Sequence, residues 1–169
     1  MKFNQSLQSE IDLLDEEVQE MVEMLSSDDE GDRLVAAVNL QQECDEDTIP
    51  FLIHALEDPS SSVQLIVVTT LWEMANAKAV LPLLECINSK RDKKVSDEAC
   101  SALKELINQD HLLKLLDYLE SDDELQINYV LILLRKIHDV QALPSISPYL
   151  SSENKNVRKE AVITLRYLN

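Results

Sequence analysis

Histidine, cysteine and the acidic residues are the side chains in this sequence that could ligate a metal or carry out acid–base chemistry. The three histidines are far apart, and none lies three to five residues from another histidine or cysteine, as zinc-ligand pairs do: His54, His111 and His138. We therefore expect neither a metal site nor a cofactor.

The sequence also lacks the patterns of nucleophilic catalysis. Cys86 and Cys100 fall on apolar or half-buried helical positions, where nothing would lower the pKa of a thiol. There is no G-x-S-x-G sequence, no P-loop and no Gly-rich phosphate-binding turn. Acidic pairs such as Glu16-Glu17 and Asp122-Asp123 are typical of solvated helix ends and turns. We predict no catalytic residue, and a function other than catalysis is favoured.

The charge of the chain is strongly negative and unevenly distributed. The formal net charge is −17, and residues 1–50 contribute −13 of it, from 15 acidic and 2 basic side chains. Such a field repels nucleic acids and anionic membrane surfaces. A protein partner with a basic segment could dock near the N-terminus. The interpretation that we favour is a solvated acidic surface that keeps the protein soluble.

The sequence indicates a cytoplasmic protein. Residues 1–17 lack the basic start and the apolar core of a secretory signal, and no apolar run is long enough to span a membrane. The cysteines, of which Cys44 is the third, are odd in number and irregularly spaced. We expect them to be reduced thiols that behave as small core hydrophobes.

The strongest pattern is an internal repeat. Apolar residues recur at intervals of 31, 31, 32 and 31 at the end of one helical segment in each copy: Leu25, Leu56, Ile87, Leu119 and Leu150. The positions four and seven residues earlier are also apolar in all five copies. These columns predict that the first helix of each repeat, helix A, has a fixed buried face.

A second helix, helix B, follows each helix A. In the second repeat we expect helix A from Ile49 to Leu56, a break at Asp58-Pro59 and helix B from about Ser61 to Met74. The apolar columns of helix B agree between the second, third and fifth repeats: Val63, Val67 and Leu71; Val95, Ala99 and Leu103; Val157, Ala161 and Leu165. In the fourth repeat, Leu125, Tyr129 and Leu133 fit best, although Ile127 competes as the first position.

These repeats predict an all-α fold, a right-handed α–α superhelix (solenoid) of about five two-helix repeats. A single hairpin cannot bury both of its faces, and stacking on its neighbours does so. We expect residues 1–10 to form a flexible N-terminal lead-in and residues 11–169 to form a single repeat domain.

Pro148 lies beyond the first turn of the last helix A and should kink or shorten it. Asn76, Asn108 and Asp139, where helix B leads to the next helix A, tolerate a left-handed backbone.

The repeats resemble a known family. VRKEAVITLRYL at 157–168, preceded by ALPSISPYLSSENKN, is similar to the short HEAT-like repeat of phycobilisome bilin-lyase subunits, and Asp32–Leu40 and Ser62–Leu71 are weaker copies. The resemblance covers about residues 12–169. It implies a HEAT-like solenoid and, as one possible function, a bilin-lyase subunit or phycobilisome-associated chaperone that acts as a heterodimer.

The family places an Arg directly after the first apolar residue of helix B, where it pairs with an Asp in the turn between helices A and B. Arg33 and Arg158 match this position, whereas the other repeats depart from it with Gln64, Ser96 and Gln126. A continuous Asp–Arg ladder is therefore not implied. Enzymes of the deoxyhypusine hydroxylase type resemble this fold as well, but they need His-Glu pairs to hold iron, and this sequence contains no His-Glu dipeptide.

In folds of this kind the B helices line the concave face, where partners dock. Two helix-B positions, two and nine residues after the first apolar residue, should share that surface. They are Leu34 and Gln41, Leu65 and Trp72, Asp97 and Lys104, Ile127 and Leu134, and Lys159 and Arg166 in repeats one to five.

The apolar members of this set suggest a binding surface, so we predict a non-enzymatic protein–protein interaction scaffold. Its partner-binding residues are Leu65, Trp72, Ile127 and Leu134. Trp72 comes first among them because Trp is enriched at binding hot spots. The alternative is that Leu65 and Trp72 only complete the packing against the neighbouring hairpin.

Overall fold

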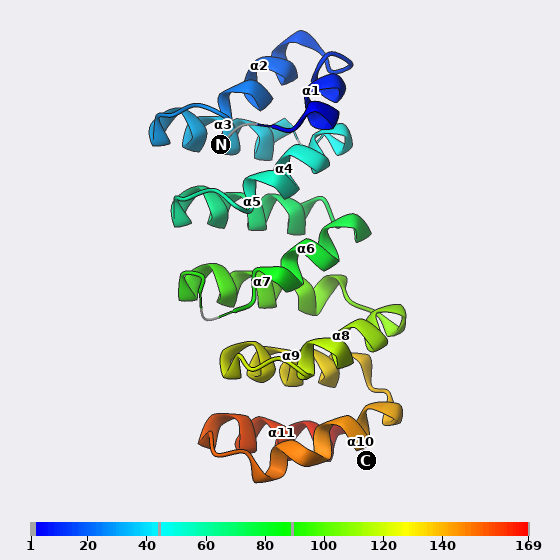
Figure 1. The fold of residues 1–169 in the computed structure, drawn as a ribbon. Coiled ribbons are helices and arrows are strands. Elements are labelled where there is room, and N and C mark those ends of the chain that lie inside the picture. Colours follow the sequence, from blue (N-terminus) through cyan, green and yellow to red (C-terminus); the bar gives the residue numbers. More distant parts are fainter. Residues whose placement is uncertain (1–2, 44, 89, 169) are drawn as a thin grey trace. The chain divides into compact units, whose positions relative to one another are not determined.

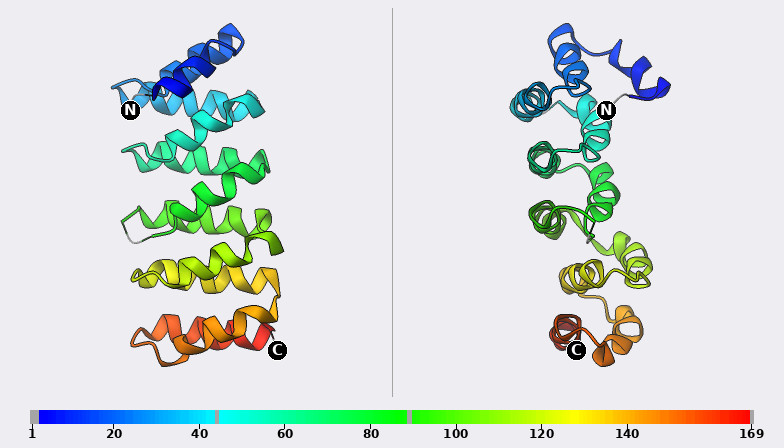
Figure 2. Two further views of the ribbon diagram at one scale, coloured as in Figure 1. Left: turned by 45° about the vertical axis from the view of Figure 1, so that its right-hand side comes forward. Right: turned by 60° about the vertical axis from the view of Figure 1, so that its left-hand side comes forward.

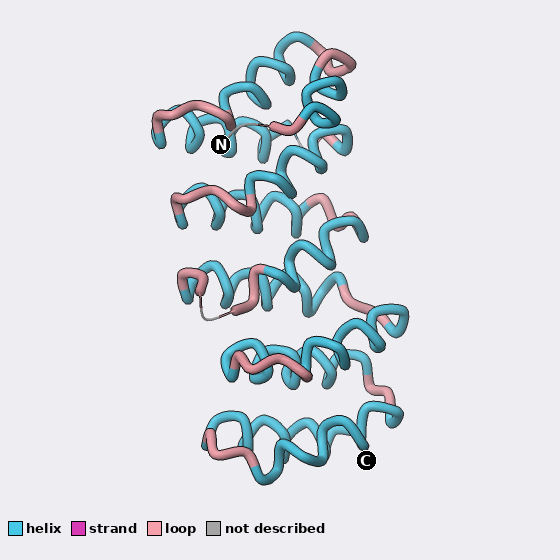
Figure 3. The backbone as a smooth tube through the Cα atoms, in the orientation of Figure 1, coloured by secondary structure: helices cyan, strands magenta, loops and turns pink. Residues whose placement is uncertain are grey.

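The computed structural model describes residues 3–43, 45–88 and 90–168, and within these ranges every regular element is a helix (Figures 1 and 3). The predicted all-α fold is therefore confirmed. The contacts divide the chain into two compact units, Met1–Cys86 and Ile87–Asn169. Cys44 lies outside the described residues.

The N-terminal unit contains two complete helical hairpins. Its elements are α1 (Gln5–Ile11), α2 (Glu16–Met24), α3 (Glu30–Glu43), the 3-10 turn η1 (Glu46–Thr48), α4 (Ile49–Ala55), α5 (Ser61–Glu73), η2 (Ala77–Ala79) and α6 (Val80–Glu85). Helix α3 packs against both α2 and α5, and α4 packs against α5. Within this unit the B helices α3 and α5 lie in one layer and the A helix α4 in the other (Figure 2).

The C-terminal unit repeats this arrangement. Its elements are α7 (Lys93–Leu106), η3 (Gln109–His111), α8 (Leu112–Leu119), α9 (Glu124–Ile137), η4 (Val140–Ala142), α10 (Leu143–Ile146), η5 (Ser147–Ser151) and α11 (Lys155–Leu168). Helix α9 lies between α7 and α11 and packs against both, as well as against α8. The third repeat is divided between the units, with its helix A as α6 and its helix B as α7.

Five equivalent caps define where each helix B begins. A side-chain oxygen accepts hydrogen bonds from backbone N–H groups of the first turn at Asp29, Ser60, Asp92, Asp123 and Asn154. These caps are 31, 32, 31 and 31 residues apart. The seventh residue after each cap is fully buried in every repeat: Ala36, Val67, Ala99, Val130 and Ala161. The caps therefore fix the register of all five B helices.

The capping register corrects the prediction for the fourth repeat. The third residue after a cap is Val63 in α5 and Val95 in α7, and in α9 it is Gln126 rather than Leu125 or Ile127. The register predicted for this helix, with Leu125, Tyr129 and Leu133 as the apolar positions, is therefore wrong by one residue. The apolar run of α9 is nearly continuous, so buried side chains occupy the predicted register as well as the register set by the cap. Apolar periodicity alone therefore could not distinguish the two registers.

Most of the segment that we expected as a flexible lead-in, residues 1–10, belongs to helix α1, which begins at Gln5. Asn4 caps α1 by accepting from the backbone N–H of Leu7, and Ile11 is fully buried. The ring of Phe3 packs edge-on against that of Phe51, with centroids 5.4 Å apart. The polar residues of this segment hide its helical pattern, because only its last residue enters the core.

The last helix A is shortened as predicted at Pro148. The α-helix ends at Ile146 and continues as the 3-10 turn η5. Leu150 was expected on the buried face and is instead exposed, because the 3-10 turn rotates it out of the helical column. The left-handed residues between repeats are Ala75 and His138, while Asn76 and Asp139 follow them in extended conformation as caps of η2 and η4.

Candidate protein-binding face on α3 and α5

The outward side of α3 and α5 carries six apolar residues that the core does not cover completely. We call this surface the α3–α5 face, and it consists of Leu34, Val35, Val38, Leu65, Ile66 and Trp72. Trp72 keeps 41% of its surface exposed. The side chain is therefore a surface residue whose inner edge contributes to packing.

A polar contact holds the two helices together at one end of this face. The amide Nε2 of Gln41 donates to the carboxylate Oε2 of Glu73 over 2.9 Å. Next to it, α3 is hollowed by about 260 Å³ along Leu34, Val35 and Val38. The hydroxyl of Thr69, which would otherwise be a polar group in the centre of the face, donates to the carbonyl of Leu65 over 3.0 Å. An apolar partner therefore meets little polar surface that must be desolvated.

The four predicted binding residues divide between the two units and between two environments. Leu65 is half-buried and Trp72 is exposed, both on α5 of the N-terminal unit. Ile127 and Leu134, on α9 of the C-terminal unit, are 7% and 0% exposed. Ile127 and Leu134 are therefore core residues, and the prediction that they bind a partner is wrong. For Leu65 and Trp72 partner binding stays a prediction.

The shifted register explains why Ile127 and Leu134 are buried. Leu134 occupies the same position as Leu71 and Leu103, which are fully buried, and Ile127 occupies the position of Arg33. The positions in α9 that correspond to Leu65 and Trp72 are Asn128 and Arg135. Sequence reasoning could have found them from Asp123, whose carboxylate caps α9 by accepting from Leu125 and Gln126.

With this register, the outward sides of the B helices differ between the units. At the two equivalent positions α3 carries Leu34 and Gln41 and α5 carries Leu65 and Trp72. In α7, α9 and α11 both positions are polar or charged: Asp97 and Lys104, Asn128 and Arg135, Lys159 and Arg166. Apolar side chains at these two positions are therefore confined to the N-terminal unit.

A buried ion pair fixes α3 relative to the next repeat. The guanidinium of Arg33 donates from Nε to Oδ2 of Asp58 over 2.7 Å and from Nη2 to Oδ1 over 3.2 Å. It also donates from Nη1 to the carbonyls of Ser27 and Asp28. The hydrogen bond to Asp58 is the main cause that raises the pKa of Arg33. Both side chains are almost fully buried, so the pair links the first turn of α3 to the turn between α4 and α5 through charge-assisted hydrogen bonds.

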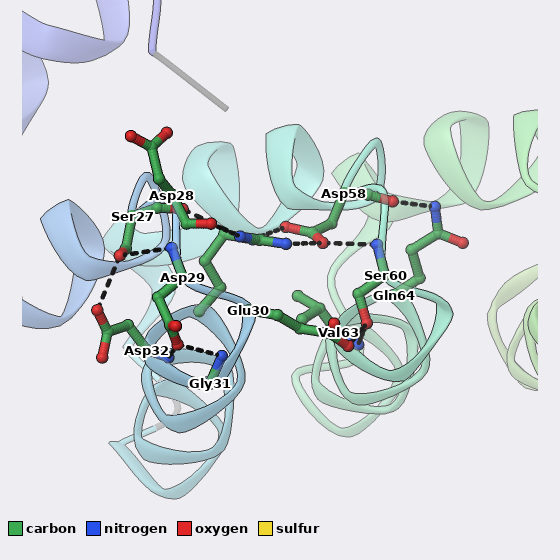
Figure 4. Close-up of polar contacts among 11 residues, drawn as sticks. Ser27, Asp28, Asp29, Glu30, Gly31, Asp32, Asp58, Ser60, Val63 and Gln64 are labelled. Carbon is green, nitrogen blue, oxygen red and sulfur yellow. Dashed lines mark hydrogen bonds and ion pairs between the residues drawn. The ribbon is translucent and has the colours of Figure 1, made fainter.

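Asp58 is the centre of this network. Besides Arg33, its Oδ1 accepts from the backbone N–H of Ser60 over 2.8 Å, and its carbonyl accepts from Nε2 of Gln64 over 2.6 Å (Figure 4). Gln64, in the position of Arg33 one repeat later, thus also binds the turn. Arg158 does the same in the fifth repeat, where Nη1 donates to the carbonyls of Ser152 and Glu153. In these three repeats the side chain in this position therefore ties helix B to the turn before it, whereas in α9 the position holds the apolar Ile127.

The remaining reactive groups do not assemble into a site. Within the described ranges, no group of three or more His, Cys, Asp and Glu side chains could hold a metal ion. Burial raises the pKa of the Cys100 thiol to about 11, which keeps it protonated and unreactive. In the part of the chain that the structure describes, no helix is long and apolar enough to cross a lipid bilayer.

The paired helices, their equivalent caps and the bonds between repeats define the class of helical-repeat solenoid proteins. Within this class the chain belongs to the HEAT-repeat family, whose model, described as HEAT repeats, matches residues 18–104, about half of the sequence. No curated protein sequence matches the chain.

Solved structures agree on the fold. The complex of CpcE and CpcF of phycocyanin lyase from Nostoc sp. PCC7120 is similar at a TM-score of 0.60 and 22% identity, over 90% of this chain and 65% of that one. This chain thus spans a little less than two thirds of the lyase chain. A designed armadillo repeat protein in complex with the peptide (KR)4 is similar at a TM-score of 0.51 and 18% identity, over 97% of this chain and 90% of that one.

Proposed function

We propose that this protein is a non-enzymatic interaction module of the cytoplasm that binds a partner protein on the α3–α5 face. The observation that carries the proposal is the group of exposed apolar side chains on α3 and α5, among them Trp72. Apolar surface on a soluble protein marks contact sites when it is contiguous and bounded by polar groups. A half-exposed Trp at its edge provides the large amphipathic contact typical of hot spots.

Charge indicates the chemistry of the partner. The N-terminal unit carries 19 acidic and 3 basic residues, a net charge of −16, whereas the C-terminal unit carries 13 and 12, a net charge of −1. A segment with apolar anchors and basic flanks complements the face in both respects. The designed armadillo repeat protein in complex with (KR)4 provides a precedent for a basic peptide bound to a similar fold.

The test uses a dye-labelled probe peptide, KRLLKRLLKR, in a fluorescence anisotropy titration of the full chain. We expect Trp72→Ala to weaken binding by at least about thirty-fold, because truncation of a hot-spot residue costs about 2 kcal/mol. The matched control is Leu81→Ala, which removes another exposed apolar side chain, 46% exposed, from α6 of the same unit. This control should bind like the unaltered protein.

Three results would count against the proposal. The first is an equal effect of Trp72→Ala and Leu81→Ala, and the second is no binding by the unaltered protein. The third is reproducible substrate turnover by the purified protein alone, which would reveal an enzyme. Circular dichroism of each variant separates loss of binding from loss of fold.

The alternative function is that of a bilin-lyase subunit or phycobilisome-associated chaperone, which would act with a second subunit. It is supported by the similarity to the phycocyanin lyase complex, at an identity that reports on fold alone. Incubation with a linear tetrapyrrole tests it directly. A change in absorbance and a gain in fluorescence would favour the alternative, and their absence would leave the interaction module as the simpler function.

A further inference from the structure

A second surface, of opposite character, lies on the C-terminal unit. The C-terminal halves of α7, α9 and α11 enclose an open hollow of about 360 Å³. It is lined by Lys104, Glu105, Ile132, Arg135, Lys136, His138 and Tyr167. We call this surface the basic hollow.

Two positive charges of the basic hollow come from one repeated position. Lys104 of α7 and Arg135 of α9 line the hollow from this position, where the N-terminal unit has Gln41 and Trp72. On α11 the same position holds Arg166, which precedes the lining residue Tyr167. Helices that pack side by side are about 8–10 Å apart, so the three charges span about 16–20 Å. Lys136 adds a fourth charge from α9.

One of these cations forms a salt bridge: Arg135 is paired through Nη2 with Oε2 of Glu160, over 3.0 Å. The side chains of Lys104, Lys136 and Arg166 are exposed and form no salt bridge within the part of the chain that the structure describes. Lys104 interacts electrostatically with Asp97 of the same helix. Glu105 is the one carboxylate in the lining of the hollow. The surface is thus locally positive in a chain whose net charge is −17.

We propose that the basic hollow binds an acidic, extended peptide segment of a protein partner, at a site separate from the α3–α5 face. An extended chain advances about 3.3–3.6 Å per residue. The distance between carboxylates three residues apart is therefore similar to the distance between neighbouring B helices. About six residues would cross all three. The segment can place one aromatic or aliphatic side chain against Ile132 and Tyr167, whose ring also contacts that of His138 at 6.2 Å.

The lining of the hollow favours a peptide over other anions. A bare phosphate would use the cations and leave Ile132 and the exposed ring of Tyr167 in water. A nucleic acid would bring a dense negative charge close to the remaining acidic groups of a strongly acidic protein. A peptide with spaced carboxylates meets both the cations and the apolar lining.

The probe is a dye-labelled peptide, DGFDGGD, which has a carboxylate on every third residue and one aromatic side chain, titrated with the full chain by fluorescence anisotropy at low salt. The test variant is Lys104→Ala/Arg166→Ala, which leaves the Arg135–Glu160 pair in place. The matched control is Lys114→Ala/Lys155→Ala, which removes two exposed cations of the same unit outside the hollow. We expect the test variant to bind at least about tenfold more weakly and the control less than about twofold more weakly, since the loss reflects local contacts and not net charge.

Three outcomes overturn the proposal. They are no binding of DGFDGGD by the unaltered protein, equal losses in the two variants, and tighter binding of a single-stranded DNA of eight nucleotides with the same sensitivity to Lys104→Ala/Arg166→Ala. Thermal unfolding of both variants checks that they fold. Because Trp72 is not part of the hollow, Trp72→Ala should leave the binding of DGFDGGD unchanged, so failure here is distinguishable from failure of the α3–α5 face.

Discussion

Neighbouring residues of one helix can serve packing and recognition separately, as Leu71 and Trp72 of α5 do. Leu71 is fully buried in the column that every helix B contributes to the core, and Trp72 lies one residue further round the helix with much of its ring in solvent. A difference of 100° on the helix thus separates a residue that stabilises the fold from one that is free to contact a partner.

Substitutions at this pair should separate stability from binding. Trp72→Ala should lower the free energy of unfolding by about 1–2 kcal/mol, because its ring is only partly buried, whereas Leu71→Ala should cost about 3–5 kcal/mol through the cavity it leaves. Chemical denaturation of both variants measures the difference. Trp72 is the only Trp, so the fluorescence of the native protein reports on its exposure. Acrylamide, a neutral quencher, should quench this fluorescence readily. It is preferred to iodide, because the acidic residues of the N-terminal unit repel an anionic quencher. Equal losses of stability would place Trp72 in the core.

Arg33 provides the second test at the scale of residues. Arg33→Gln would leave the carboxylate of Asp58 buried without its counter-ion, and we expect a loss of about 3–5 kcal/mol of stability. Arg158→Gln is the matched control, since Arg158 occupies the same position, is less buried and donates to carbonyl groups only. It should cost about 1 kcal/mol. Urea denaturation of the two variants decides, and similar midpoints would show that the ion pair adds nothing beyond the carbonyl contacts.

At the scale of elements, the helices were largely predictable and their registers only partly so. Ile49 to Leu56 and Ser61 to Met74 were expected as helices, and α4 and α5 end within a residue of these bounds. Apolar spacing succeeds there because each helix has one buried face. It fails in α9, where buried residues occur on most sides, and the cap at Asp123 is the signal that resolves the register. For the same reason, the surface position of the predicted binding residues was expected correctly only for Leu65 and Trp72, which lie in a helix of clear register, and not for Ile127 and Leu134.

Contacts between neighbouring B helices should make the C-terminal unit sensitive to acid. Tyr129 of α9 donates its hydroxyl to Oδ1 of Asp97 on α7, and Lys93 donates to Oδ2 over 2.6 Å. The hydrogen bonds from Lys93 and Tyr129 lower the pKa of Asp97 below its ordinary 3.8. A carboxylate with a lowered pKa in the folded state stabilises that state above pH 3.8, and this contribution is lost as the pH falls further.

Asp97→Asn should therefore reduce the dependence of stability on pH below about pH 4, where the native carboxylate takes up its proton. Thermal unfolding of the variant and of the unaltered protein between about pH 2.5 and pH 6 measures this dependence. Glu98→Gln, one residue further on, is the control and should retain the native profile. Identical profiles for Asp97→Asn and the unaltered protein would show that the contact from α7 to α9 carries no net stabilisation.

At the scale of the whole molecule, both the net charge and the outward-facing residues of the B helices change at the boundary between the two units. The unit with the apolar α3–α5 face holds −16 of the net charge of −17, and the unit with the basic hollow is almost neutral. The partners that we propose for the two units therefore differ in charge. A chain of repeats can carry such different surfaces because the core positions repeat while the outward positions are free to vary.

This division predicts that charge and apolar contact act on different rate constants of binding at the α3–α5 face. Steering by the negative field acts before contact, so raising NaCl from about 50 to about 500 mM should slow association of KRLLKRLLKR at least about tenfold and change its dissociation little. Truncation of Trp72 removes a contact that exists only in the complex, so Trp72→Ala should accelerate dissociation and leave association almost unchanged. Stopped-flow anisotropy at both salt concentrations gives the two constants. An affinity independent of salt would remove the electrostatic role of the acidic unit, and a slower association in Trp72→Ala with unchanged dissociation would remove Trp72 from the contact surface.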